Sequence, residues 1–240
     1  MERIKKLPVI KILRNALVDM RESAFSYVVF IAVNFLFSVA GFSIVGGFKE
    51  PLFLILVLFY YAFWVYFFRF YFKLKPYFII SDTVSSFVPS VKILFIGAVF
   101  ILALAFLPFV PLFLDNMSIE QKDEYLQMLQ NYMQENKLVD LFLSVLFLFA
   151  SPVIFYRPFM AWISSITGSG GSMRKAFAKT KGNYWRFVLL GLLLNLPFIL
   201  WSQLSFYLPY MNIWVIYLPV SIFFVYYNVV IARVYKFFNP

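Results

Sequence analysis

The sequence predicts an all-α polytopic membrane protein with six transmembrane helices, and three observations lead to this fold class. Of the 240 residues, 63% are hydrophobic and only 13% are charged, whereas soluble domains carry roughly 25% charged residues. Too few polar side chains are therefore present to coat a water-soluble surface of this size. Six apolar stretches also reach the length of about 20 residues that a bilayer requires. Finally, connecting segments rich in Lys and Arg alternate along the chain with segments that have few, as expected when they lie on opposite sides of a membrane.

The six predicted spans share an apolar composition and a length close to that of a membrane-crossing helix. They cover residues 24–45, 51–71, 91–114, 139–162, 186–207 and 212–233. We expect them to form one integral membrane domain over residues 1–240, a single bundle of helices.

The basic residues predict the orientation of the bundle, because Lys and Arg favour the cytoplasmic side. With the N-terminus inside, eighteen of the 21 Lys and Arg residues fall in inside segments, and the outside keeps only Lys49, Lys122 and Lys137. The net charge is then +14 inside and −4 outside, which together give the total of +10. We therefore expect both termini in the cytoplasm, and the localisation expected is a bacterial cytoplasmic membrane.

The long outer loop is predicted to contain an amphipathic helix at 118–137. Ser118 and Gln121 have the spacing of a capping box, and apolar residues such as Tyr125 and Leu129 then recur at helical spacing. Such a helix is interpreted as a structured connector, with a lid or docking surface as the alternative.

A basic helix is predicted at 172–182, with Ser172 as its N-cap and Gly182 as its stop. Its sequence and that of the following span match an earlier segment at an offset of 160 residues: "ILRNALVDMRESAFSYVVFIAVN" at 12–34 and "SMRKAFAKTKGNYWRFVLLGLLL" at 172–194. The pairs are Leu13 with Met173, Arg14 with Arg174, Ala16 with Ala176, Leu17 with Phe177, Arg21 with Lys181, Phe25 with Trp185, Tyr27 with Phe187 and Val28 with Val188. Each copy is interpreted as an interfacial helix that leads into a transmembrane helix. The residues expected to face lipid are Leu13, Ala16, Leu17 and Met20 in one copy and Met173, Ala176, Phe177 and Thr180 in the other.

The stretch "GSMRKAFAKTKGNYWRFVLL" resembles the signature of a diffuse group of bacterial six-helix membrane proteins. That group includes the membrane domain attached to some glycerophosphodiester phosphodiesterases. The resemblance covers mainly residues 170–198 and implies a membrane domain of this topology. The catalytic barrel of those enzymes has no counterpart in this chain, so their activity does not carry over.

Composition also restricts the chemistry. The chain has no Cys and no His, which removes thiol chemistry, His-based acid–base catalysis and most zinc, copper and haem sites. We expect no catalytic residues, no cofactor and no metal. The net positive charge lies beside hydrophobic spans, so anionic lipids are favoured as partners and nucleic acid is not.

The candidate site residues fall into two sets. Those predicted to reach lipid headgroups are Arg14, Arg174, Lys175, Lys179, Lys181 and Arg186. The polar residues predicted within the spans are Asn34, Arg157, Asn195, Gln203 and Asn228. We interpret Arg157 as a side chain that snorkels to the headgroups; the alternative is that it contacts a buried partner or a substrate. The amide side chains are expected to form hydrogen bonds between helices.

These observations favour a non-enzymatic, lipid-interacting or complex-forming scaffold or accessory subunit, with a membrane-protein partner or a second copy of the chain as its binding partner. The alternative is a small transporter or permease subunit for a lipid or hydrophobic solute.

Overall fold

All regular structure in the described part of the chain is helical. The computed structural model describes residues 6–45, 50–74, 145–168 except 147, 172–206 and 213–239, and isolated residues between 84 and 128. The helices are α1 (Val9–Glu22), α2 (Ala24–Val45), α3 (Glu50–Tyr71), the π-helix η2 (Pro152–Tyr156), α8 (Arg157–Ile166), α9 (Met173–Lys179), α10 (Tyr184–Phe206) and α11 (Ile213–Phe238). The prediction of an all-α protein is confirmed for these residues.

Three helices in the described residues are long and apolar enough to cross a membrane. They contain the stretches Ala24–Gly41, Tyr184–Trp201 and Ile216–Phe238. A fourth apolar helix, Ile55–Tyr71, is shorter. These lengths and compositions support a membrane protein. The predicted span at 91–114, except Val91, and the first part of the span at 139–162 lie outside the described residues.

Helix α11 ends five residues later than the predicted span at 212–233. Arg233 was expected to mark the cytoplasmic end of that span. Instead its side chain pairs with Asp19 of α1, and the residues that follow continue the helix into the protein interior. Val234, Tyr235 and Phe238 are buried there. Tyr235 contacts Phe72 and Thr167, and Phe238 stacks on Phe187, so packing extends the helix beyond its expected end.

Most of the predicted outer helix at 118–137 lies outside the described residues. Its predicted capping box is present, however. The Ser118 amide donates to Gln121 Oε1 at 2.9 Å, and the Gln121 amide donates to Ser118 Oγ at 3.3 Å. The spacing of Ser118 and Gln121 thus predicted this local structure correctly.

The apolar face of α1 packs on protein, and the prediction that all of it faces lipid is wrong. Ala16 is 0% exposed, and Val9 and Ile12 are buried with it. Tyr226 of α11 donates a hydrogen bond to the Leu13 carbonyl at 3.1 Å. Helix α1 packs on α11, which the periodicity of α1 alone could not reveal, because lipid and protein interiors both favour apolar side chains. Only Leu17 of the four residues named in this copy remains mostly exposed.

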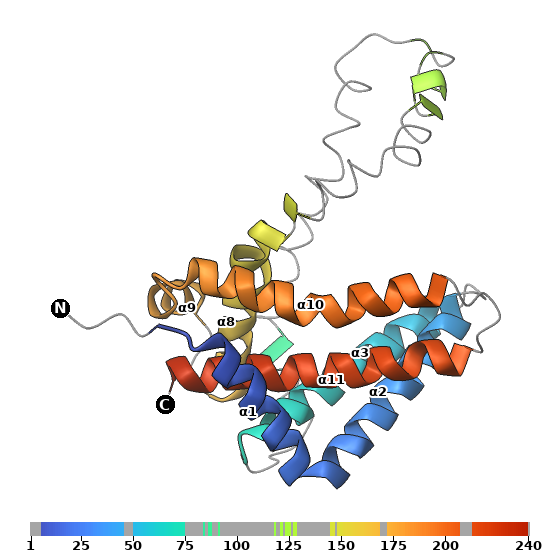
Figure 1. Ribbon diagram of the computed structural model, residues 1–240. Helices are drawn as coiled ribbons and strands as arrows, with labels where there is room; N and C mark the ends of the chain where they lie inside the picture. Colours follow the sequence, from blue (N-terminus) through green and yellow to red (C-terminus); the bar gives the residue numbers. More distant parts are fainter. Residues whose placement is uncertain are drawn as a thin grey trace.

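The bundle core joins aromatic side chains of α2 and α3 to mostly aliphatic side chains of α11. Phe67 and Phe68 of α3 are fully buried, and the Phe30 and Phe67 rings lie 4.9 Å apart in an edge-on arrangement. The centres of the Trp64 ring and the Phe224 ring of α11 lie 5.2 Å apart. Figure 1 shows α10 and α11 running antiparallel, with α1, α9 and both chain ends gathered at one end of the bundle. We call this the terminal end.

Candidate functional site

Helix α9 forms at the terminal end as the sequence predicted, although it is shorter than 172–182. The Ser172 side chain caps it by accepting a hydrogen bond from the Lys175 amide at 3.4 Å. After Lys179 the chain turns through Gly182, whose φ of +77° is the left-handed conformation that glycine adopts without strain. Gly182 therefore separates α9 from α10, in agreement with the prediction that it ends the basic helix.

The lipid-facing prediction for α9 is also wrong in part. Ala176 is buried and Thr180 is 0% exposed. The Thr180 hydroxyl donates to the Ala176 carbonyl at 2.8 Å, so its polar group is satisfied inside the helix. The short helix packs on α8, because a seven-residue amphipathic helix is stable only with a packing partner.

Asn183 joins the "GNYW" stretch to the start of the chain. Its side chain is 1% exposed, and its Oδ1 accepts a hydrogen bond from the Leu7 amide at 2.7 Å. Arg186 donates to the Leu7 carbonyl. Both backbone groups of Leu7 are thus satisfied by the first turn of α10, which holds the segment before α1 across a sequence separation of 176 residues. Sequence reasoning did not identify this contact.

Arg157 lies where a π-helix changes into an α-helix. Its amide donates to the Pro152 carbonyl, five residues back, and the wide turn accommodates Pro158, whose ring would crowd a regular helix. The guanidinium carbon lies 5.0 Å from the centre of the Phe177 ring of α9, an arrangement that favours a cation. The buried Arg157 Nε has no hydrogen-bond partner among the residues that the structure describes. Arg157 is therefore held against α9, at the terminal end, and the predicted snorkelling stays a prediction.

The six predicted headgroup residues differ in what they contact. Arg186 holds Leu7, and Lys179 donates to Asn239 Oδ1. The other four have exposed side chains and form no ion pair with a carboxylate in the described part of the chain: Arg14, Arg174, Lys175 and Lys181. Two of the six cations thus tie chain segments together, and four remain available to a ligand.

The paired positions of the two similar segments have matching environments. Of the eight pairs, six fall in the same burial class. Ala16 and Ala176 are both buried, and Tyr27 and Phe187 are both buried one turn or more into the following helices. Phe25 and Trp185 are 83% and 69% exposed. Leu17 with Phe177 and Val28 with Val188 are the pairs that differ. Each copy therefore presents a large exposed aromatic ring directly after its basic helix.

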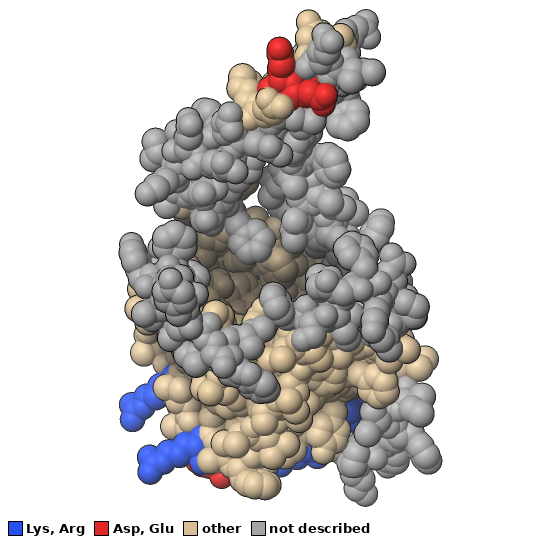
Figure 2. Space-filling view, turned by 90° about the vertical axis from the view of Figure 1, so that its right-hand side faces the viewer, with Lys and Arg blue, Asp and Glu red and all other residues tan. Residues whose placement is uncertain are grey.

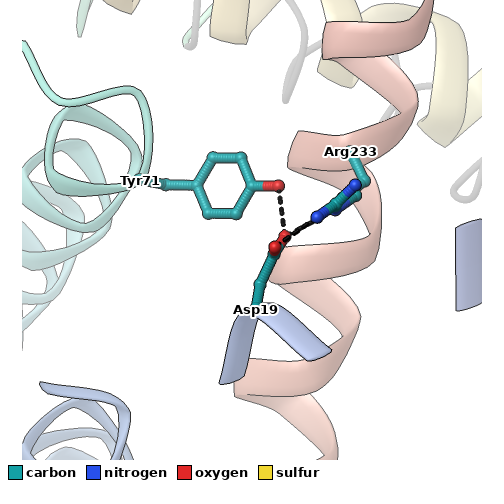
Figure 3. A network of polar contacts seen from close by, with 3 residues as sticks. All are labelled: Asp19, Tyr71 and Arg233. Carbon is teal, nitrogen blue, oxygen red and sulfur yellow. Dashed lines mark hydrogen bonds and ion pairs between the residues drawn. The ribbon is translucent and has the colours of Figure 1, made fainter. Parts of the chain in front are cut away.

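Asp19, Tyr71 and Arg233 form a polar network that the sequence analysis missed (Figure 3). Arg233 of α11 donates through two nitrogens to the Asp19 carboxylate, with Nε to Oδ2 at 2.5 Å, and Tyr71 of α3 donates to the same Oδ2 at 2.8 Å. The network joins three helices. A signal was present: Asp19 continues the face of Ile12 and Ala16 at helical spacing, so it was directed toward the protein.

The predicted intramembrane amides are hydrogen-bonded in two ways. Asn34 is buried and its Oδ1 accepts from Tyr60 of α3 at 2.9 Å, so it joins two helices as predicted. Asn195 and Asn228 instead donate to carbonyls four residues earlier in their own helices, both at 2.8 Å. The side chain of Gln203 lies outside the described residues.

The terminal end carries exposed cations and exposed aromatic rings. No group of three or more Asp or Glu side chains gathers there or elsewhere in the described part of the chain to hold a metal. On the face seen in Figure 2, the described surface is largely uncharged, and Lys and Arg side chains are visible at its lower edge. The chemistry available is charge recognition by guanidinium and ammonium groups beside exposed aromatic rings.

Comparison with known proteins gives no match of any kind: no family model, no curated protein and no solved structure matches the chain.

Proposed function

We propose that the chain is a non-enzymatic six-helix protein of a bacterial cytoplasmic membrane, with both termini in the cytoplasm, and that it binds anionic phospholipid headgroups as a scaffold or accessory subunit. The observation that carries this proposal is the composition of the terminal end. Four exposed cations, Arg14, Arg174, Lys175 and Lys181, accompany exposed Phe25 and Trp185. Aromatic rings and cations together are typical of helix ends at the headgroup level.

The fixed positions of α1 and α9 support a binding role over simple orientation of the helices. Both helices are packed onto the bundle through buried Ala16 and Ala176, so their cations are held in place. Cations on a fixed surface lose little conformational freedom when a headgroup binds.

The transporter alternative gains no support from the described polar residues. Asn195 and Asn228 satisfy their amide groups within their own helices, and Asn34 bonds to Tyr60. The protein itself thus supplies a hydrogen-bond partner to each of these amide groups. Arg157, with its buried Nε, remains the residue on which that alternative would depend.

The proposal is tested by native mass spectrometry of protein extracted gently from its own membrane. We expect retained phosphatidylglycerol or another anionic phospholipid to exceed its share of the membrane. Replacing Arg174, Lys175 and Lys181 together by Gln should reduce this enrichment. The matched control replaces Lys49, Lys122 and Lys137, which carry the same total charge on the predicted outer side, and should leave it unchanged. Equal losses in both variants would show that net charge alone is responsible and would refute the proposal.

The same spectra test the scaffold role. A protein partner retained in defined stoichiometry supports it, and Tyr132→Glu in the predicted outer helix should release that partner while the bundle remains folded. A protein that always emerges with one lipid or solute and no partner would contradict the scaffold role and favour the transporter.

A further inference from the structure

An apolar groove of about 310 Å³ runs along the outside of the bundle between α2 and α3. Phe25, Val29 and Val33 of α2 line one side, and Tyr66 and Phe70 of α3 line the other. Its volume lies within the range of small-molecule sites. Val29 and Tyr66 are more than 40% exposed, so the groove is open along its length to whatever surrounds the helices.

The floor of the groove is fixed by ring contacts. The Phe30 ring lies 5.3 Å from Phe70 and 5.7 Å from Phe63, and Phe30 is itself buried. Val29 and Val33, on the α2 side of the groove, are β-branched, so their side chains have few rotamers in a helix. A ligand entering this groove would therefore order few side chains, which lowers the entropic cost of binding.

Two exposed cations flank one end of the groove in the sequence. Arg21, in the last turn of α1, lies four residues before Phe25, and Lys73 follows Phe70 by three residues. The hydrogen bond from Tyr71 to Asp19 at 2.8 Å draws these two chain segments together. Glu22 is also exposed nearby, whereas Asp19 is already occupied by Arg233. The chain segments at this end of the groove thus carry two exposed cations, Arg21 and Lys73, and one exposed carboxylate that no described residue pairs, Glu22.

The turn that carries Lys73 is held in an unusual conformation. Lys73 has a φ of 54°, in the left-handed region where glycine is the usual residue at a helix end. Two backbone hydrogen bonds fix this turn, from Lys73 to the Phe70 carbonyl and from Leu74 to the Arg69 carbonyl, both at 3.0 Å. Strained backbone positions cluster at functional sites, so the conformation of Lys73 makes its ammonium group a candidate for ligand binding.

We propose that this groove binds one anionic phospholipid, with an acyl chain between α2 and α3 and its phosphate near Arg21 and Lys73. The inference rests on the proposed function in that it places the terminal end at the headgroup level. It goes further by assigning a single lipid to a single site. The occupant follows from charge complementarity, because an apolar trough ending at two cations matches an acyl chain ending in an anionic headgroup.

A second groove provides a matched control. It lies between α10 and α11, has a volume of about 320 Å³, and is lined by apolar residues that include Leu196, Leu200 and Trp201. These residues lie well along α10, away from the terminal end. No Lys or Arg lines either groove, but the nearest described cation along α10, Arg186, lies seven residues before Leu193. It should accept acyl chains without preference for headgroup charge.

The test reconstitutes the full chain in nanodiscs of phosphatidylcholine and phosphatidylglycerol and counts lipids retained in native mass spectrometry as activation energy rises. We expect one phosphatidylglycerol to remain after all others have left. Val29→Trp should fill the groove and abolish this last lipid, whereas Leu200→Trp, the same kind of change in the second groove, should keep it. Arg21→Gln with Lys73→Gln should lower the preference for phosphatidylglycerol by roughly tenfold.

Two results would overturn the proposal: a wild-type protein that retains both lipids equally, or loss of the last lipid in Leu200→Trp as well as Val29→Trp. Melting temperatures of the two Trp variants should agree, because both replaced side chains are largely exposed. Failure of the headgroup proposal is read separately, from total phosphatidylglycerol enrichment in the α9 variant of Arg174, Lys175 and Lys181.

Discussion

Asn183 and Asn195 show that the same amide has different importance in two environments. Asn183 is almost fully buried and bonds to the distant Leu7 amide, whereas Asn195 is half-buried and bonds within α10. Asn183→Ala leaves a buried N–H without a partner, which costs about 1–3 kcal/mol. We expect a lower melting temperature and faster proteolysis before α1. Asn195→Ala should change neither, and equal effects of the two variants would contradict this assignment.

Asp19 is the only carboxylate that Arg233 contacts in the described residues, so Asp19→Asn removes the charge partner of a partly buried guanidinium. The side chains are 18% and 28% exposed, which places the pair between a surface pair and a buried one. We expect a loss of about 1–3 kcal/mol in chemical denaturation. Tyr71→Phe removes one hydrogen bond and should cost about 1 kcal/mol. A Tyr71→Phe effect larger than that of Asp19→Asn would show that the ion pair is not the main contribution.

At the scale of elements, helix α1 is a packed helix with an exposed basic side. It packs on α11, with Ala16 fully buried and Leu17 exposed. Ala16→Leu should overpack this interface and destabilise the bundle by about 1–3 kcal/mol. If Ala16 instead faced lipid, the added apolar surface would strengthen membrane binding. Leu17→Ala serves as the control and should leave the melting temperature nearly unchanged. A neutral Ala16→Leu variant would refute the packing of α1 on α11.

At the scale of the whole molecule, the absence of cysteine makes the orientation directly measurable. Lys175→Cys and Lys122→Cys each introduce one thiol, the first in α9 and the second in the predicted outer loop. We expect a membrane-impermeant maleimide added to intact cells to label Lys122→Cys only. After the membrane is permeabilised, both variants should be labelled. Labelling of Lys175→Cys from outside would reverse the predicted orientation.

The sequence by itself determined the features that depend on local spacing and solvent. The span predicted at 24–45 coincides with α2, and those at 51–71 and 186–207 differ from α3 and α10 by at most two residues at either end. Apolar length decides where such helices begin and end. Capping also follows from spacing, as Ser118 with Gln121 and Ser172 with Lys175 show.

Only the tertiary structure decided which polar and apolar faces meet each other. Periodicity shows that Ala16 lies on an apolar face, but lipid and helix α11 are equally apolar surroundings for it. Charge patterning placed Asp19 and Arg233 in separate flanking segments, and only the fold brings them together across 214 residues. The same holds for Leu7 and Asn183. A side chain's partner across the chain depends on how the helices pack, and a single sequence does not contain that arrangement in any local pattern.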